Sequence, residues 1–308
     1  MKLKSLNKIP LNFSICFCYN EITNKVRPAC VSSERQNMVN KKFEELQFSD
    51  AFMFAAAMED EEICRRVLER TLGIPVKRVR VRCEDTLFIN PDYRGIRMDV
   101  YADDEEGTVF DVEMQTTDKK DLPWRSRLYQ AQMDLEALKP GNAFRKLPKS
   151  FIIFICGFDP FDQELYRYSF ESCCRETGKP LRDDANRIFL NTKGRNPCGT
   201  PPELIRFLKY VEEAAVSSDD TDSLIQLIET RITGLKHNYG MEVEYLRFAE
   251  MLHDEHQEGL QEGLQEGIEN LLTLIDRMEA DGLTEEITHV RKDPKFREEM
   301  FQKYHIGF

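Results

Sequence analysis

The stretch that decides the fold is residues 96–115, IRMDVYADDEEGTVFDVEMQ. Residues 96–101 and 109–115 each alternate polar and apolar side chains, which is the two-residue period of a β-strand. The segment between them, DDEEG at 103–107, is polar and ends in a glycine that suits a tight turn. The stretch therefore predicts two neighbouring antiparallel strands joined by a hairpin turn.

Carboxylates gather on one face of these two strands. On the second strand, Asp111, Glu113 and Gln115 point the same way, and on the first strand Asp99 shares its face with Arg97. Adjacent antiparallel strands bring same-face carboxylates close together, and like charges so placed repel each other. A hard divalent cation is the usual reason for such a cluster. The residues alone leave another interpretation open, in which these carboxylates face solvent and pair with Arg97 and other basic side chains.

The composition limits the classes of protein that fit. The chain has 308 residues, 41% of them hydrophobic and 32% charged, which suits one or two globular domains. A formal net charge of −12 excludes a protein that grips nucleic acid with its whole surface. The nine cysteines show no ligand spacing, which predicts reduced thiols and a cytoplasmic protein. The apolar run at residues 11–19 is too short to span a bilayer, so no membrane partner is expected.

Periodic patterns divide the chain into three parts. Residues 1–37 match no pattern and are expected to be a disordered extension. Residues 38–200 predict an α/β domain with a mixed sheet, in which the apolar segment 150–156 is a strand covered on both faces. Residues 201–308 contain helical patterns only, which places a domain boundary near residue 200.

Two helices of the α/β part bear on the candidate site. Ser49 is expected to cap a helix that begins near Asp50. A later helix is predicted to begin at Asp121 and Pro123. The stripe expected to be buried on it comprises Trp124, Leu128, Ala131, Leu135 and Leu138. Three polar residues lie about 100° around the same helix from that stripe, namely Arg125, Tyr129 and Gln132.

Residues 257–268 form a four-residue repeat, QEGLQEGLQEGI. Because four residues nearly complete a helical turn, Gly259, Gly263 and Gly267 form one stripe and the apolar residues form a neighbouring one. Each glycine costs a helix interior about 1 kcal/mol, which close approach by another helix would offset. The repeat therefore predicts either a homo-oligomer formed through the C-terminal helical region or a flexible helical tail.

Several motifs together resemble the PD-(D/E)XK nuclease superfamily, and most closely its recombination-promoting nucleases and PD-(D/E)XK transposases. The motifs are FSDxF at 48–52, RMDV at 97–100, FDVEMQ at 110–115, RSRxY at 125–129 and the Glu-Gly repeat of the tail. The resemblance spans about residues 40–270. It implies a restriction-endonuclease-like mixed β-sheet core flanked by helices, followed by an all-helical C-terminal region.

The resemblance also implies roles for single residues. Asp99 and Glu113 are expected to ligate Mg²⁺ or Mn²⁺ together with the backbone carbonyl of Met114, and Asp50 is a further candidate for the metal shell. Gln115 stands where the family motif usually has lysine. An amide orients water or phosphate by hydrogen bonds but supplies no positive charge.

The implied function is a metal-dependent DNA endonuclease linked to recombination or mobile elements. Its catalytic residues would be Asp99, Glu113 and Gln115, while Arg125, Tyr129 and Gln132 would bind phosphates of the DNA. Gln115 and the acidic net charge keep an alternative open. In that alternative the protein is a nuclease-like module with weak or no catalysis that binds DNA or another protein.

Overall fold

The computed structural model describes residues 41–87, 96–214 and 221–306. Within these residues the chain divides into two compact units, with the boundary between Arg247 and Phe248. The described part of the first unit contains the sheet and most of the helices, whereas that of the second is helical throughout. The predicted disordered extension, residues 1–37, lies outside the described residues.

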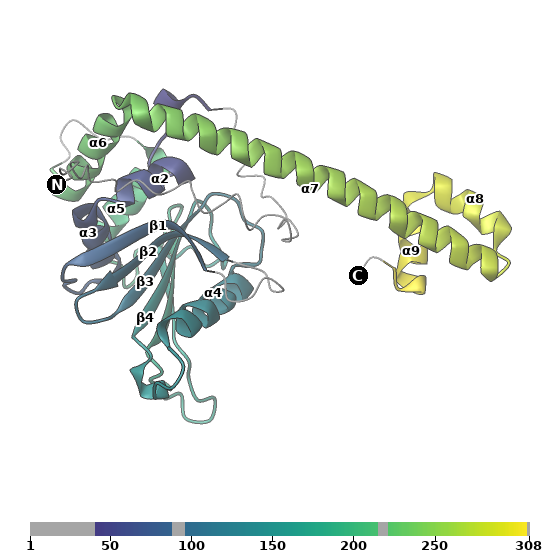
Figure 1. The fold of residues 1–308 in the computed structure, drawn as a ribbon. Helices are drawn as coiled ribbons and strands as arrows, with labels where there is room; N and C mark the ends of the chain where they lie inside the picture. The colour runs from purple at the N-terminus through teal and green to yellow at the C-terminus, as the bar shows by residue number, and fades with distance from the viewer. Residues whose placement is uncertain (1–40, 88–95, 215–220, 307–308) are drawn as a thin grey trace, which may run out of the picture. The chain divides into compact units, whose positions relative to one another are not determined.

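A six-stranded mixed sheet forms the centre of the first unit in its described part (Figure 1). The strands are β1 (Val79–Leu87), β2 (Ile96–Asp104), β3 (Val109–Gln115), β4 (Ser150–Cys156), β5 (Arg167–Phe170) and β6 (Ala185–Asn191). Their spatial order is β1-β2-β3-β4-β6-β5. β2 and β3 form the predicted antiparallel hairpin, and β4 runs parallel to both β3 and β6. Every residue of β4 is buried, as expected from its apolar sequence.

The turn between β2 and β3 explains why this hairpin forms locally. The Asp104 carboxylate accepts hydrogen bonds from the main-chain N–H groups of Glu106 and Thr108, at 2.9 and 2.8 Å. Gly107 has a φ of 84°, a conformation that costs glycine little and other residues more. Acidic residues and one glycine thus fix the register that brings Asp99 opposite the end of β3.

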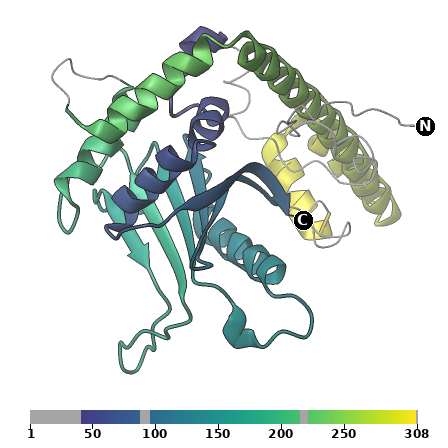
Figure 2. The ribbon, with the colours of Figure 1, turned by 60° about the vertical axis from the view of Figure 1, so that its left-hand side comes forward.

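Helices cover both faces of the sheet (Figures 1 and 2). One face packs against α2 (Ala51–Met58), α3 (Glu61–Leu72), α5 (Pro202–Glu213) and α6 (Ser223–Lys236). The opposite face packs against α4 (Leu122–Ala137). Val112 and Met114 point into the first core, so that the alternate residues of β3 face α4.

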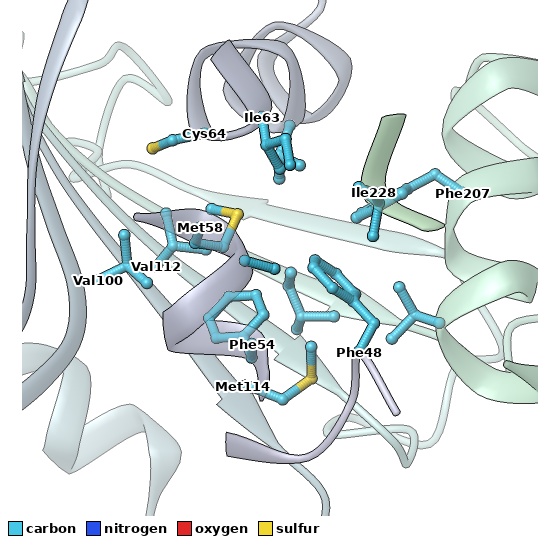
Figure 3. Packing of buried hydrophobic residues seen from close by; sticks show 14 of the residues in the cluster. Phe48, Phe54, Met58, Ile63, Cys64, Val100, Val112, Met114, Phe207 and Ile228 are labelled. Atoms are coloured by element: carbon cyan, nitrogen blue, oxygen red, sulfur yellow. The ribbon is translucent and has the colours of Figure 1, made fainter. Parts of the chain in front are cut away.

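The larger core joins the sheet to the four helices on its first face (Figure 3). Phe48 is part of this core, and the centroid of its ring lies 5.3 Å from that of Phe54 and 6.2 Å from that of Phe207. Full burial of a large apolar side chain stabilises a fold by about 1.5–3 kcal/mol. Since Val112 and Met114 are part of this core, packing on the first face holds β3 rigidly beneath the residues of its second face.

Acidic side chains lie at the starts of α2 and α3. The Asp60 carboxylate caps α3 by accepting from the N–H groups of Glu62 and Ile63, and Gly73 ends that helix with a φ of 71°. The expected cap at Ser49 is wrong by one residue, because Asp50 is the N-cap of α2.

The expected buried stripe of α4 is wrong. Trp124, Leu128 and Leu135 are exposed by 63%, 41% and 61%, and Ala131 is exposed as well. The buried residues of α4 are mostly polar ones: Leu122, Ser126, Tyr129, Gln130, Gln132 and Met133. The sheet face beneath α4 carries the carboxylates of β3, and buried carboxylates need polar partners, which an apolar stripe does not provide.

The chain after residue 200 is helical throughout its described part, as expected. The compact unit nevertheless extends beyond the predicted boundary, as far as Arg247. The reason is that α5 and α6 bury Leu204, Phe207 and Ile228 in the core of the first unit.

The second unit begins within α7 (Tyr239–Ala280), which carries the repeat, and continues through α8 (Thr284–Lys292) and α9 (Pro294–Tyr304). Leu274, Met278, Ile287 and Val290 form its small core.

None of the described helices combines the length and apolarity needed to cross a membrane. The cysteines in the described residues are free thiols, in line with the expected reduced state, and the cytoplasmic location stays a prediction.

Candidate active site

Where the regular pairing of β2 and β3 ends, the carboxylates of Asp99 and Glu113 each accept a hydrogen bond from a main-chain N–H of the other strand. The pairing runs from Asp103 opposite Val109 to Val100 opposite Val112. Beyond it, the Asp99 N–H donates to Glu113 Oε1 at 3.0 Å, and the Met114 N–H donates to Asp99 Oδ2 at 3.0 Å. Each carboxylate takes a hydrogen bond that a carbonyl of the neighbouring strand would otherwise accept. The main chain therefore fixes the two carboxylates beside each other.

The carboxylates of β3 are buried and do not face solvent. Asp111 is 0% exposed and Glu113 is 1% exposed, while Asp99 is half-buried. The interpretation of solvent-facing carboxylates is therefore wrong for both residues of β3. Neither carboxylate oxygen of Asp111 has a hydrogen-bond partner among the described residues. A buried acid without partners is unfavourable unless something offsets its charge.

Burial also perturbs the acidity of these groups. It raises the pKa of the Glu113 carboxyl well above its usual range, and the charges of Asp99 and Asp111 raise it further, whereas Arg125 opposes the shift. Burial likewise raises the pKa of the Asp111 carboxyl, with Asp99 as the next cause. Interacting buried acids with shifted pKa values are typical of functional sites.

Arg125 reaches this cluster from α4. Its Nη1 donates to Gln115 Oε1 at 2.6 Å, and its Nη2 donates to the Tyr129 hydroxyl at 2.9 Å and to Glu113 Oε2 at 3.3 Å. The guanidinium also lies over the rings of Tyr129 and Phe154, 5.4 and 5.7 Å from their centroids. Four of the predicted site residues are thus in direct contact: Glu113, Gln115, Arg125 and Tyr129.

Two further predicted residues, Gln132 and Asp50, lie in different surroundings from those four. Gln132 is buried on the same helix as Arg125 and Tyr129. Asp50 pairs with Lys41 at 2.7 Å and accepts from the Gln47 N–H at 2.8 Å, at the start of a helix that packs on the other face of the sheet. None of the hydrogen bonds or ion pairs of Asp50 in the described residues reaches Asp99 or Glu113. The structure therefore does not bring Asp50 into the cluster.

The donor chemistry of the cluster suits a hard cation, since its carboxylate and carbonyl oxygens are the ligands that Mg²⁺ and Mn²⁺ prefer. The described residues contain no group of three His, Cys, Asp or Glu side chains arranged to hold a metal. A cation between Asp99 and Glu113 would therefore need a main-chain oxygen as well. The Met114 N–H points at Asp99, and the carbonyl of a strand residue faces the same neighbouring strand as its N–H. The Met114 carbonyl thus lies on the side of β3 that such a cation would occupy.

Asp111 is the member of the cluster to which the sequence assigned no role. The alternation of β3 placed it on the face of Glu113, and this was the signal available. Its complete burial depends on side chains from other elements, which strand alternation does not reveal.

One of three comparisons with known proteins found a match. The comparisons with curated proteins and with solved structures returned no match. Residues 35–199, more than half of the chain, match the sequence family described as PD-(D/E)XK nuclease family transposase. The matched range contains the whole sheet together with α2, α3 and α4, and therefore every residue of the cluster. The chain belongs to the PD-(D/E)XK nuclease family transposases.

Proposed function

We propose that this protein is a divalent-metal-dependent DNA endonuclease that hydrolyses phosphodiester bonds in recombination or in the movement of mobile elements. The observation that carries the proposal is the interlock of Asp99 and Glu113, since it presents two carboxylates from adjacent strands at one point. Family membership supports a nuclease-like function linked to mobile elements. The metal dependence and the DNA substrate are the finer parts of the proposal.

Asp99, Glu113 and the Met114 carbonyl would hold Mg²⁺ or Mn²⁺. Asp111 beside them fits this assignment: its carboxylate oxygens accept no hydrogen bond within the described part of the chain, and a nearby cation would offset its buried charge. When bound, such a cation polarises a phosphoryl oxygen and lowers the pKa of its water. Asp50 is retained only as an outer candidate, since Lys41 already holds its carboxylate.

Arg125, Tyr129 and Gln132 would bind the phosphates of the substrate. Their helix lies over the same sheet face as Glu113, and the side chain of Arg125 keeps 26% of its surface exposed, which leaves it accessible to a phosphate. Guanidinium groups match phosphate oxygens in a bidentate manner. Gln115 lies between this group and the carboxylates, because it contacts both Arg125 and Glu113.

The second candidate function is a nuclease-like module that binds DNA or a protein without turnover. The specific observation in its favour is the pairing of Arg125 with Glu113 and Gln115, which engages the cationic group of the site within the protein. In that case DNA or protein binding would persist without metal-dependent cleavage.

A plasmid-nicking assay in Mg²⁺, in Mn²⁺ and in chelator separates the two functions. We expect the parent to nick DNA only with metal, and Asp99→Asn and Glu113→Gln to lose at least about 100-fold in rate. Asp103→Asn on the same strand is the matched control, since Asp103 pairs with Arg80 in an exposed ion pair. Equal nicking by the parent and both site variants would contradict the assignment.

The C-terminal repeat supports a further partner, a second copy of this chain. Leu260, Leu264 and Ile268 form an exposed ridge along α7 at four-residue spacing. The glycines lie beside the ridge, and a Cβ at Gly263 or Gly267 would meet no atom within 4 Å, so the helix backbone is open to close approach there. Ridges and grooves of this spacing on two helices interdigitate at a crossing angle of about −50°. Glu262 and Glu266 of the repeat lie about 200° around the helix from the ridge, so we expect two copies to meet through faces without these charges.

A further inference from the structure

Gln115 and Arg125 form the closest side-chain contact of the candidate site. The Nη1 of Arg125 lies 2.6 Å from Oε1 of Gln115, and the two residues come from β3 and α4. Gln115 is 6% exposed and the side chain of Arg125 is 26% exposed, so this contact is partly shielded from water. Hydrogen bonds to a charged group in a buried setting are stronger than those between neutral groups.

Chemistry fixes the orientation of the Gln115 amide. A guanidinium has only N–H donors, so the amide atom that faces Arg125 must be the oxygen. The Nε2 of Gln115 then points towards Glu113 Oε2, at 3.4 Å. Gln115 therefore has its acceptor engaged by Arg125 and its amide nitrogen directed to the proposed metal ligand.

Arg125 is held on three sides. Besides Gln115, the Tyr129 hydroxyl accepts from Nη2, and Glu113 lies within ion-pair distance at 3.3 Å. The ring of Phe154 lies on another side of the guanidinium. A flexible cation held in this way is preorganised, and its charge lies beside Gln115, the residue at the position where the motif usually has lysine.

We propose that Arg125 supplies the positive charge that the motif lysine usually provides, and that Gln115 is a positioning residue that holds Arg125 by accepting its hydrogen bond. This inference rests on the proposed nuclease function. Arg125 stabilises the charge that develops on the phosphate under attack, and Gln115 acts through Arg125. Lysine would combine the motif position and the positive charge in one side chain on β3, whereas here Gln115 on β3 holds that position and Arg125 on α4 supplies the charge.

The proposal reverses the effect expected of restoring lysine. If Gln115 were only a weak substitute, Gln115→Lys would increase activity. With Arg125 in place, however, the new ammonium would lie beside a guanidinium and remove its acceptor, and like charges in a buried setting repel strongly. Lysine at this position is useful only when the arginine is absent.

The test is a double-mutant cycle measured in Mn²⁺ by single-turnover nicking. We expect Arg125→Gln to lower the rate by about 100-fold or more, and Gln115→Lys alone to lower it as well. The double variant, Gln115→Lys with Arg125→Gln, should cleave faster than Arg125→Gln alone. Arg127→Gln is the matched control, because Arg127 is exposed on the same helix, and its rate should equal that of the parent.

A melting experiment in chelator tests the same pair without metal or activity. Gln115→Lys should lower the melting temperature when Arg125 is present and change it less in the Arg125→Gln background. Increased cleavage by Gln115→Lys in the presence of Arg125, or Arg125→Gln cleaving as fast as Arg127→Gln, would overturn the inference while leaving the nuclease assignment intact. A parent without metal-dependent cleavage would instead refute the proposed function, and this inference with it.

Discussion

The main-chain N–H of Asp99 donates to the carboxylate of Glu113 at 3.0 Å, at the point where the pairing of their strands ends. A side chain of one strand thereby takes over a hydrogen bond from the ladder of the sheet. This arrangement holds the Glu113 carboxylate between β2 and β3, where its position is set by backbone geometry and not by a flexible surface rotamer. The remaining features of the site follow from this fixed pair.

Asp111 provides a test of stability in the metal-free protein. Burial raises the pKa of its carboxyl, with Asp99 as the next cause, so the folded state holds the proton more tightly than the unfolded chain does. The group therefore stabilises the fold below about pH 4, and this contribution is lost as the pH rises through the folded-state pKa. We expect Asp111→Asn to raise the free energy of unfolding near pH 8 by about 1–3 kcal/mol and to change it little near pH 4.

Urea unfolding in chelator at the two pH values measures this effect. Glu105→Gln is the control, because Glu105 is exposed in the hairpin turn and should leave the unfolding free energy nearly unchanged. If Asp111→Asn destabilised the protein at both pH values, the view of Asp111 as an uncompensated buried charge would fail.

Asp222 provides the opposite case, away from the site. Its carboxylate is 3% exposed and pairs with Arg70 at 2.7 Å, which ties the start of α6 to α3. Burial acts to raise the pKa of Asp222, but the hydrogen bond and charge of Arg70, together with the N–H groups of Leu224 and Ile225, lower the pKa overall. The stabilisation is therefore present above about pH 4 and is lost as the pH falls through the folded-state pKa.

Asp222→Asn should accordingly cost about 1.5–3 kcal/mol of unfolding free energy at neutral pH, and less as the pH falls below about 4. Chemical denaturation across this range is the measurement. Glu62→Gln, which breaks only an exposed pair with Arg65, should cost less than about 1 kcal/mol. A cost at Asp222 that did not decrease in acid would show that its charge is not the source of the stabilisation.

The sequence predicted the strands and the face of the sheet well, because both depend on local alternation. The hairpin of β2 and β3 and the buried strand β4 required no more than the two-residue period and an apolar run. The alternation placed Asp99 and Glu113 on one face of the hairpin, but it did not predict that their carboxylates accept hydrogen bonds from the main-chain N–H groups of Met114 and Asp99.

What failed were predictions that depend on partners distant in the sequence. Trp124 and Leu135 have helical spacing and were expected to be buried, yet α4 turns Tyr129 and Gln132 to the sheet, where the carboxylates of β3 lie on a face that is otherwise largely apolar. The contact between Gln115 and Arg125 was missed for a related reason. Spacing along a helix gives the angle of a residue but not the side chain that it meets.

The repeat of α7 predicts self-association that a single charge should disrupt. Leu264 is 67% exposed at the centre of the apolar ridge. Leu264→Glu would place a carboxylate in the proposed interface, where an unpaired buried charge is unfavourable. We expect sedimentation velocity to show a dimer for the parent and a monomer for this variant.

Glu262→Gln, on the side of α7 away from the ridge, should leave the dimer intact. A parent that sediments as a monomer at tens of micromolar protein would refute association through the repeat. The alternative, a flexible helical tail, would then be the better description of residues 257–268.

Calorimetric titration of Mn²⁺ into the parent and into the Asp99→Asn, Glu113→Gln double variant tests the central claim most directly, since it detects the cation without requiring cleavage. The account predicts saturable binding of one ion by the parent and its loss in the double variant, while Asp103→Asn binds as the parent does. Unchanged binding by the double variant, or no binding by a parent that still nicks DNA in Mn²⁺, would show that these two carboxylates do not hold the metal.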